Sequence, residues 1–183
     1  MSEKLNHDRY DNAYVRSLLC EHKTIAMIGA SAKSNRPSYF ALRYLLAKGF
    51  EITPVNPGHA GCEILGRKVY ATLADVPAPV EIVDIFRNSR AALGITREAI
   101  ALKDRLGVKV IWMQLGVRND EAAREAEAAG LKVIMNRCPK IEYGRLCGES
   151  GWMGINSRMI SSKRPLLAVG GIQNHVLGSG RES

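Results

Sequence analysis

A glycine turn followed by hydroxyl and basic side chains carries the first recognisable chemistry in this sequence. The apolar run 24–28 leads into Gly29-Ala30-Ser31-Ala32-Lys33, and Arg36-Pro37-Ser38 follows where a helical pattern begins. A buried strand that enters a tight turn and then a helix presents backbone N–H groups and a positive helix end to an anion. Arg36 adds a planar fork of donors that suits a phosphate. We therefore predict a phosphate-binding turn.

The next strand indicates which nucleotide this turn would serve. An NAD site needs an acidic residue about 20 positions after the turn, where it holds the ribose hydroxyls. Here the strand ends in Pro54-Val55-Asn56-Pro57 without an acid, and Gly29 alone remains of the G-x-G-x-x-G pattern. The pattern therefore disfavours NAD. An NADP-dependent oxidoreductase or an NAD(P)-sensing domain stays open, because Arg36 could accept the 2′-phosphate of NADP.

Other reactive chemistries find little support in the sequence. Ser31 lacks the second glycine of a nucleophile elbow, because Lys33 stands in its place. The histidines show no ligand spacing with cysteines or acids, and the four cysteines contain no C-x-x-C pair. We predict no catalytic residue, no metal site, and reduced thiols rather than a disulfide framework.

The elements that must position these residues alternate regularly along the chain. Apolar runs and helical periodicity predict strands over 24–28, 51–55, 80–86, 108–112 and 131–135, helices over 8–22, 37–48, 92–106 and 120–129, and a hairpin over 64–70. Such alternation predicts a Rossmann-like, doubly wound α/β fold in which a five-stranded parallel sheet is covered on both faces, giving three layers. Ligands bind outside the carboxyl ends of such strands. The candidate loops are 29–38, 56–61, 86–90, 113–118 and 136–140.

Composition narrows the class of partner and the location. The net charge of +8 over 183 residues suits an anionic partner, but the basic residues are dispersed, so nucleic acid is disfavoured. No apolar run reaches the roughly 18 residues of a membrane span, and the first eight residues are too polar for a signal peptide. We expect a single cytoplasmic domain over 1–164 and a mobile tail over 165–183.

The order and spacing of the loop motifs resemble a known family. Read together, they look like the stand-alone CoA-binding proteins, which are similar to the CoA-binding domain of the succinyl-CoA synthetase alpha subunit. The resemblance covers about residues 23–140, continues weakly to Arg164, and implies the strand order 3-2-1-4-5. The motifs are Gly29-Ala30-Ser31, Arg36-Pro37-Ser38-Tyr39, Pro54-Val55-Asn56-Pro57, Phe86-Arg87, Trp112-Met113-Gln114-Leu115-Gly116 and Asn136-Arg137-Cys138-Pro139.

The resemblance implies a nucleotide-binding site for coenzyme A or an acyl-CoA. It assigns the turn after the first strand to the phosphates and the loop at Phe86 to the adenine. In the stretch after the second strand, His59 takes the place of a lysine in the synthetase. The implied ligand-binding residues are Gly29, Ala30, Ser31, Ala32, Lys33, Arg36, Pro37, Ser38, Asn56, Pro57, His59, Phe86, Arg87, Asn88, Gln114 and Gly116.

The same resemblance implies binding without ligation. The synthetase uses a second domain with a phosphorylated histidine, and the segment around His175 is unlike that loop. We therefore expect a binding or regulatory protein whose partner is a small CoA ligand. A homo-oligomer or a further protein partner stays open. Cys138 is expected to be a buried, inert thiol; a mixed disulfide with the coenzyme is the alternative.

Overall fold

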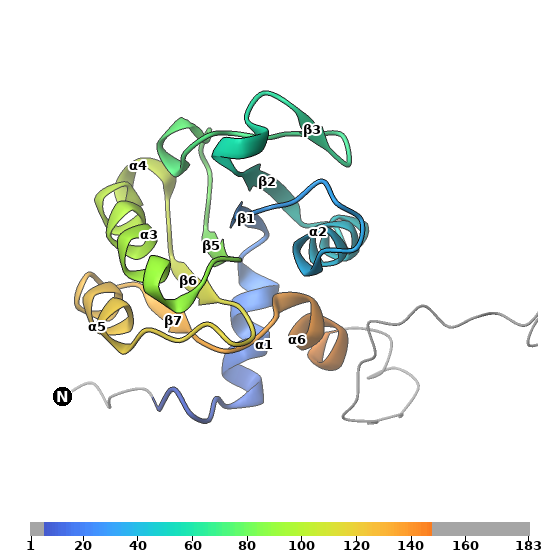
Figure 1. The fold of residues 1–183 in the computed structure, drawn as a ribbon. Coiled ribbons are helices and arrows are strands. Elements are labelled where there is room, and N and C mark those ends of the chain that lie inside the picture. Colours follow the sequence, from blue (N-terminus) through green and yellow to red (C-terminus); the bar gives the residue numbers. More distant parts are fainter. Residues whose placement is uncertain (1–5, 148–183) are drawn as a thin grey trace, which may run out of the picture.

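The computed structural model describes residues 6–147, and these form a three-layer α/β fold (Figure 1). The expected tail over 165–183 and His175 lie outside the described residues. The same is true of the stretch 148–164, over which the family resemblance continues to Arg164. Five parallel strands make the central sheet: β1 (Thr24–Ile28), β2 (Glu51–Val55), β5 (Ile82–Ile85), β6 (Val110–Met113) and β7 (Lys132–Ile134). The predicted fold class is confirmed.

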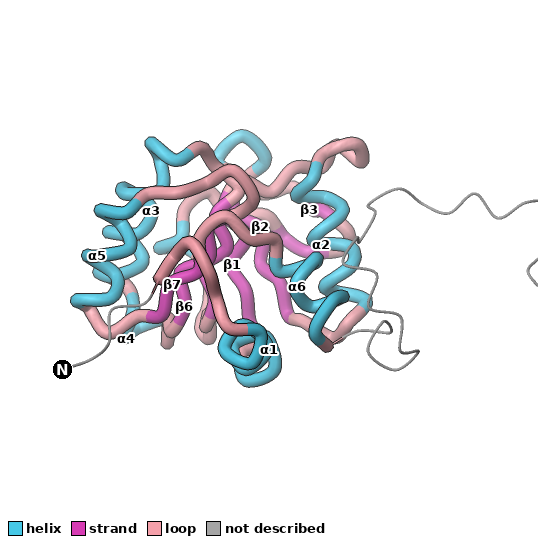
Figure 2. The backbone as a smooth tube through the Cα atoms, turned by 90° about the horizontal axis from the view of Figure 1, so that it is seen from below, coloured by secondary structure: helices cyan, strands magenta, loops and turns pink. Residues whose placement is uncertain are grey.

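Helices cover both faces of the sheet, as the view from below shows (Figure 2). On one face lie α3 (Ser89–Ala101), α4 (Lys103–Leu106) and α5 (Asp120–Ala128). On the other face lie α1 (Asn12–Glu21), α2 (Pro37–Ala47) and α6 (Pro139–Leu146). Each face has its own apolar core. The buried face of α5 consists of alanines, namely Ala122, Ala123 and Ala126, which allow this helix to approach the sheet closely.

The order of the strands differs from the expected 3-2-1-4-5. The observed order is β2-β1-β5-β6-β7, so the third long strand, β5, pairs with β1 and β6 rather than with β2. The place beside β2 is taken by a single parallel bridge between Val55 and Tyr70. Tyr70 N donates to Pro54 O, and Asn56 N donates to Tyr70 O. The order that the resemblance implied is therefore wrong for β5, because the position beyond β2 holds this single bridge and not a full strand.

Several local predictions are confirmed, and some boundaries move. The short hairpin consists of β3 (Glu63–Ile64) and β4 (Arg67–Lys68). Two 3-10 turns, η1 (Pro57–His59) and η2 (Leu73–Asp75), lie in the connection from β2 to β5. The helix expected over 92–106 begins at Ser89 and is divided into α3 and α4. Helix α6, in contrast, was not predicted. Within residues 6–147, no helix is long and apolar enough to cross a membrane.

Candidate functional site

A cavity of about 560 Å³ opens among the loops that follow the carboxyl ends of the strands. Pro37 and Phe40 contribute from α2, Phe86 and Arg87 from the loop after β5, and Gln114 from the loop after β6. The far wall belongs to the start of α6, through Cys138, Lys140 and Ile141. The cavity lies at the edge where the topology of a doubly wound sheet places ligands, and its volume is in the range of small-molecule sites.

Gly29 sets how closely the first turn approaches the loop after β5. Its φ is +90°, and a Cβ built there would lie 2.7 Å from the carbonyl oxygen of Phe86 and 2.9 Å from Cδ of Arg87. A left-handed backbone and a contact below 3.0 Å both exclude other side chains at this position. The tight turn predicted at Gly29 is therefore present, and it brings the phosphate-binding candidate loop against Arg87.

Asn56 joins two of the candidate loops. Its Nδ2 donates to Ala30 O at 2.7 Å, and its Oδ1 accepts from Gly58 N at 2.9 Å. Both ends of the amide are therefore used by the protein's own backbone. This holds the turn after β1 beside η1, which also carries Pro57 and His59.

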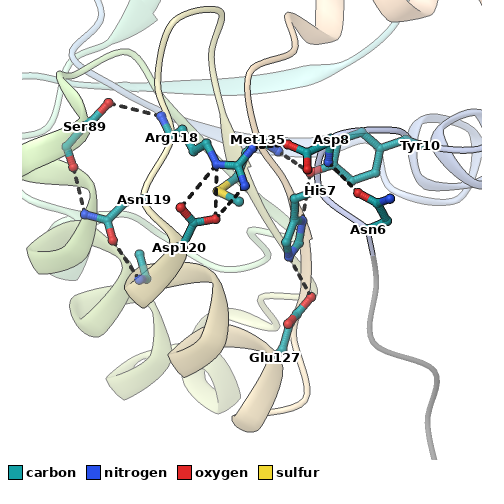
Figure 3. A network of polar contacts seen from close by, with 11 residues as sticks. Asn6, His7, Asp8, Tyr10, Ser89, Arg118, Asn119, Asp120, Glu127 and Met135 are labelled. Atoms are coloured by element: carbon teal, nitrogen blue, oxygen red, sulfur yellow. Dashed lines mark hydrogen bonds and ion pairs between the residues drawn. The ribbon is translucent and has the colours of Figure 1, made fainter.

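A second set of contacts fixes the loops after β5 and β6 to each other (Figure 3). Arg118 N donates to Ser89 Oγ at 3.1 Å, and Asn119 Nδ2 donates to Ser89 O at 3.0 Å. Asn88 caps α3 by accepting from Ala91 N at 2.9 Å. Gly116 N donates to Asn136 Oδ1 at 2.8 Å, which adds the loop after β7. The rim of the cavity is thus held by its own hydrogen bonds.

The segment before α1 supports the same rim from outside (Figure 3). Met135 N donates to the hydroxyl of Tyr10 at 2.8 Å, and burial raises the pKa of that hydroxyl to about 12. His7 Nε2 lies 3.2 Å from Glu127 Oε1 on α5. Asp8 pairs with Arg118, which also pairs with Asp120. The start of the described chain is therefore anchored to α5, β7 and the loop after β6.

A buried carboxyl group lies beneath the cavity. Asp84 is fully buried in β5, and Gln114 Nε2 lies 2.9 and 3.1 Å from its two carboxylate oxygens. Burial raises the pKa of Asp84 to about 8, against a smaller lowering by the Gln114 hydrogen bond. Because the amide nitrogen of Gln114 faces Asp84, its Oε1 is the atom left to accept a hydrogen bond from a ligand.

Cys138 forms part of the cavity wall as a protonated thiol. It is 8% exposed, and burial raises the pKa of its thiol, with the Asp84 charge adding to the rise and backbone hydrogen bonds from α6 opposing it. A thiol with a raised pKa is a weak nucleophile. The buried, inert thiol that the sequence favours matches this setting.

Unpaired cations line the cavity and the loop that leads into α2. Arg87 and Lys140 line the cavity, whereas Lys33 and Arg36 are exposed on the loop that leads into α2. None of the ion pairs found among residues 6–147 involves these four side chains. Several positive charges without acidic partners form a site for a multiply charged anion. Across the same residues, no cluster of three or more His, Cys, Asp or Glu side chains could hold a metal ion.

Comparison with known proteins identifies the family of the domain that contains this cavity. The family model described as "CoA binding domain" matches residues 23–144. The chain belongs to the CoA-binding domain family. The matched range contains all five strands of the sheet and every residue that lines the cavity.

Relatives of this CoA-binding domain occur both alone and within larger proteins. The uncharacterized protein YneT of Bacillus subtilis (strain 168) is 32% identical over 131 residues, which cover 72% of this chain and 93% of YneT. A solved structure of a hypothetical protein from Pyrococcus horikoshii OT3 is 36% identical with a TM-score of 0.72, covering 81% of this chain and all of that one. The ADP-forming acetate–CoA ligase I subunit alpha of Pyrococcus furiosus is 33% identical over 93 residues, 49% of this chain but 19% of that subunit.

Some of the predicted site residues of this CoA-binding domain line the cavity, and the others lie in the elements around it. Pro37, Phe86, Arg87 and Gln114 line the cavity. The others lie in the surrounding loops or helix starts and do not line it: Gly29, Ala30, Ser31, Ala32, Lys33, Arg36, Ser38, Asn56, Pro57, His59, Asn88 and Gly116.

The predicted site residues leave out several side chains that line the cavity. Lys140 and Ile141 follow Pro139 at the first position of α6, and this helix-starting proline was the available signal. Phe40 lies one turn after Pro37 on α2, so the helical period could have placed it on the same side. Asn35, Leu115 and Val117, like Lys140, lie within the predicted candidate loops but were not named as site residues.

Proposed function

We propose that this protein binds coenzyme A or an acyl-CoA in the cavity at the carboxyl edge of its sheet. The observation that carries the proposal is the coincidence of a cavity of about 560 Å³ with unpaired cations, inside the range that matches the CoA-binding family model. Coenzyme A carries a pyrophosphate and a 3′-phosphate. Arg87 and Lys140 line the cavity and are placed to meet these charges, with Lys33 and Arg36 close by on the loop that enters α2.

The apolar and polar lining suits the rest of such a ligand. Phe86 and Phe40 offer aromatic surface to an adenine ring or to the pantetheine chain. Gln114 offers its Oε1 to an N–H donor, and both adenine and the pantetheine amides carry such donors. The similarity to the Pyrococcus furiosus acetate–CoA ligase subunit supports the same ligand class. Ligation is not part of the proposal, because the match spans 19% of that subunit.

Calorimetric titration of coenzyme A tests the role of the cavity charges. Replacing Arg87 by Ala removes a charge-assisted contact and should weaken binding by about 1.5–3 kcal/mol, or roughly ten- to 150-fold. Arg124, exposed on α5 away from the cavity, provides the matched control, and Arg124→Ala should leave the affinity unchanged. Equal affinities for wild type and Arg87→Ala, or equal losses in both variants, would contradict a ligand site at this cavity.

A further inference from the structure

Two cysteines far apart in the sequence meet where the last turn of α1 lies beside the end of α6. Cys20 lies in the last turn of α1, and Cys147 follows α6 as its C-terminal cap. Their sulfur atoms are 3.6 Å apart across 127 positions of sequence. Cys20 is exposed and Cys147 is half-buried. The other two cysteines differ, since Cys62 is exposed on a separate loop and Cys138 is buried in the cavity wall.

The packing of α1 against α6 keeps these sulfurs together. Lys23 Nζ donates to Leu19 O at 2.8 Å and lies 5.2 Å from the ring centre of Tyr143 on α6. Arg145 on α6 donates to Asn12 Oδ1 at 2.8 Å at the start of α1. These contacts join both ends of α1 to the second half of α6. They hold the two helices in one relative position and therefore keep the two thiols close together.

The two thiols differ in exposure, and burial affects the pKa of Cys147. Burial and the hydrogen bond with Cys20 raise the pKa of the Cys147 thiol, while the nearby charges of Arg16 and Lys23 lower it. Exposed Cys20 is accessible to a reagent in solution, whereas Cys147 is partly covered and in contact with it. This is the arrangement of an attacking thiol with a resolving thiol beside it.

We propose that Cys20 and Cys147 are a redox-active dithiol that is oxidised by low-molecular-weight disulfides such as glutathione disulfide. The Cys20 thiolate attacks one sulfur of the reagent, which releases one glutathione thiolate and leaves a mixed disulfide on Cys20. The Cys147 thiolate then attacks the Cys20 sulfur and expels the second glutathione. Two electrons pass from the protein dithiol to glutathione disulfide, giving one protein disulfide and two glutathione molecules, and the thiol protons pass to solvent or to glutathione.

Oxidation would restrain one wall of the cavity. The first turn of α6 supplies Lys140 and Ile141 to the cavity, and its last residue precedes Cys147. A bond from Cys147 to Cys20 ties the far end of this helix to α1. A restrained wall lowers the ordering cost of binding, so the oxidised protein should hold its ligand more tightly. This consequence rests on the proposed function, whereas the disulfide itself does not.

Thiol titration and mass measurement on the full chain test the disulfide. Exposed Cys62 would form its own glutathione adduct, so Cys62→Ser serves as the parent protein, and Cys62→Ser/Cys20→Ser is the comparison. After glutathione disulfide treatment the parent should lose two titratable thiols and the mass of two hydrogens, retain no glutathione, and yield a linked Cys20–Cys147 peptide. Its melting temperature should rise by about 5–15 °C, because the new bond closes a long loop. A stable glutathione adduct on Cys20, or an unchanged melting temperature, would overturn the proposal.

Coenzyme A titration of the same parent protein separates the two claims. Several-fold tighter binding by the oxidised form, reversed by dithiothreitol and absent from Cys62→Ser/Cys20→Ser, is the expected result. Equal affinity in both redox forms would overturn the restraint of the cavity wall. If the disulfide forms but neither form binds coenzyme A, the proposed function fails while the dithiol stands.

Discussion

The carboxyl group of Asp84 lies fully buried under the cavity, where its partner is the amide nitrogen of Gln114. A buried carboxylate without a cationic partner is costly, and the group responds by holding its proton. The pKa of about 8 follows from this burial. Asp84 therefore positions Gln114, and at neutral pH it does so in its protonated form.

This protonation makes the stability of the protein depend on pH in a defined direction. The pKa of Asp84 rises on folding from 3.8 to about 8, so the folded state holds a proton that the unfolded chain releases between these values. The contribution of Asp84 to the free energy of unfolding therefore falls as the pH rises through this window, by up to about 1.4 kcal/mol per unit.

Urea unfolding of Asp84→Asn at pH 5 and pH 7.5 measures this effect. An amide cannot release a proton, so the variant should gain on the order of 3 kcal/mol relative to wild type between the two pH values. Asp104→Asn, at an exposed position on α4, is the matched control and should follow wild type. Parallel pH profiles for wild type and Asp84→Asn would show that the carboxyl group is ionised in the folded protein.

Arg36 offers a second test at the scale of one side chain. It is exposed at the N-cap of α2, and Arg36→Ala should weaken coenzyme A binding by about 1.5–3 kcal/mol while leaving the melting temperature of the free protein unchanged. Calorimetry with dephospho-CoA identifies its target. If the loss disappears with dephospho-CoA, Arg36 serves the 3′-phosphate; if it persists, Arg36 serves the pyrophosphate. If Arg36→Ala leaves the affinity for coenzyme A unaltered, Arg36 is a solvated surface residue that does not contact the ligand.

The sequence predicted positions at this scale better than it predicted roles. Phe86, Arg87 and Gln114 were expected at the site and line the cavity. Asn56 and Asn88 use their side chains on backbone N–H groups of their own loops, a role that asparagine commonly takes in turns and helix caps. The contact of Asp84 with Gln114 joins β5 to the loop after β6, 30 positions along the chain. Such a contact depends on register, which a single sequence does not specify.

At the scale of elements, the alternation of strands and helices was predictable because the strands are short, largely apolar runs bounded by turn residues. The order of the strands was not, because pairing between strands far apart in the chain, such as β1 with β5, leaves no signal in a single sequence. Helix α6 escaped prediction because its apolar pattern is weak, although Pro139 marks its start. The predicted candidate loop 136–140 covered only the start of this helix, so Ile141 was absent from the expected site.

Gly29 provides a test of how the elements are joined at the site. Gly29→Ala places a Cβ 2.7 Å from Phe86 O at a φ of +90°, and should lower the free energy of unfolding by about 2–4 kcal/mol. Gly49→Ala separates the clash from the backbone strain, because Gly49 has a φ of +83° with nothing within 4 Å. It should cost only about 1–2 kcal/mol. Equal losses in urea unfolding would mean that the turn does not press against the loop after β5.

At the scale of the whole molecule, the proposed function is binding without turnover. Thioester hydrolysis requires an activated nucleophile or water and stabilisation of an oxyanion. The cavity offers Arg87, Lys140 and Gln114, which bind charge and polar groups, together with a Cys138 thiol whose raised pKa disfavours the thiolate.

A thiol-release assay with acetyl-CoA and succinyl-CoA tests this expectation. The rate of thioester loss should equal the rate without protein, both for wild type and for Cys138→Ser. Steady loss above that background, abolished by Cys138→Ser, His59→Ala or Ser31→Ala, would identify an enzyme instead of a binding protein.

Thermal unfolding with coenzyme A and with NADPH tests the central claim most directly. Coenzyme A at 100 times its Kd should stabilise the folded protein by about 2.7 kcal/mol. For a domain of this size the melting temperature should then rise by roughly 5–10 °C. NADPH and NADH at the same concentration should produce little change. A larger rise with either dinucleotide than with coenzyme A would contradict the proposed function.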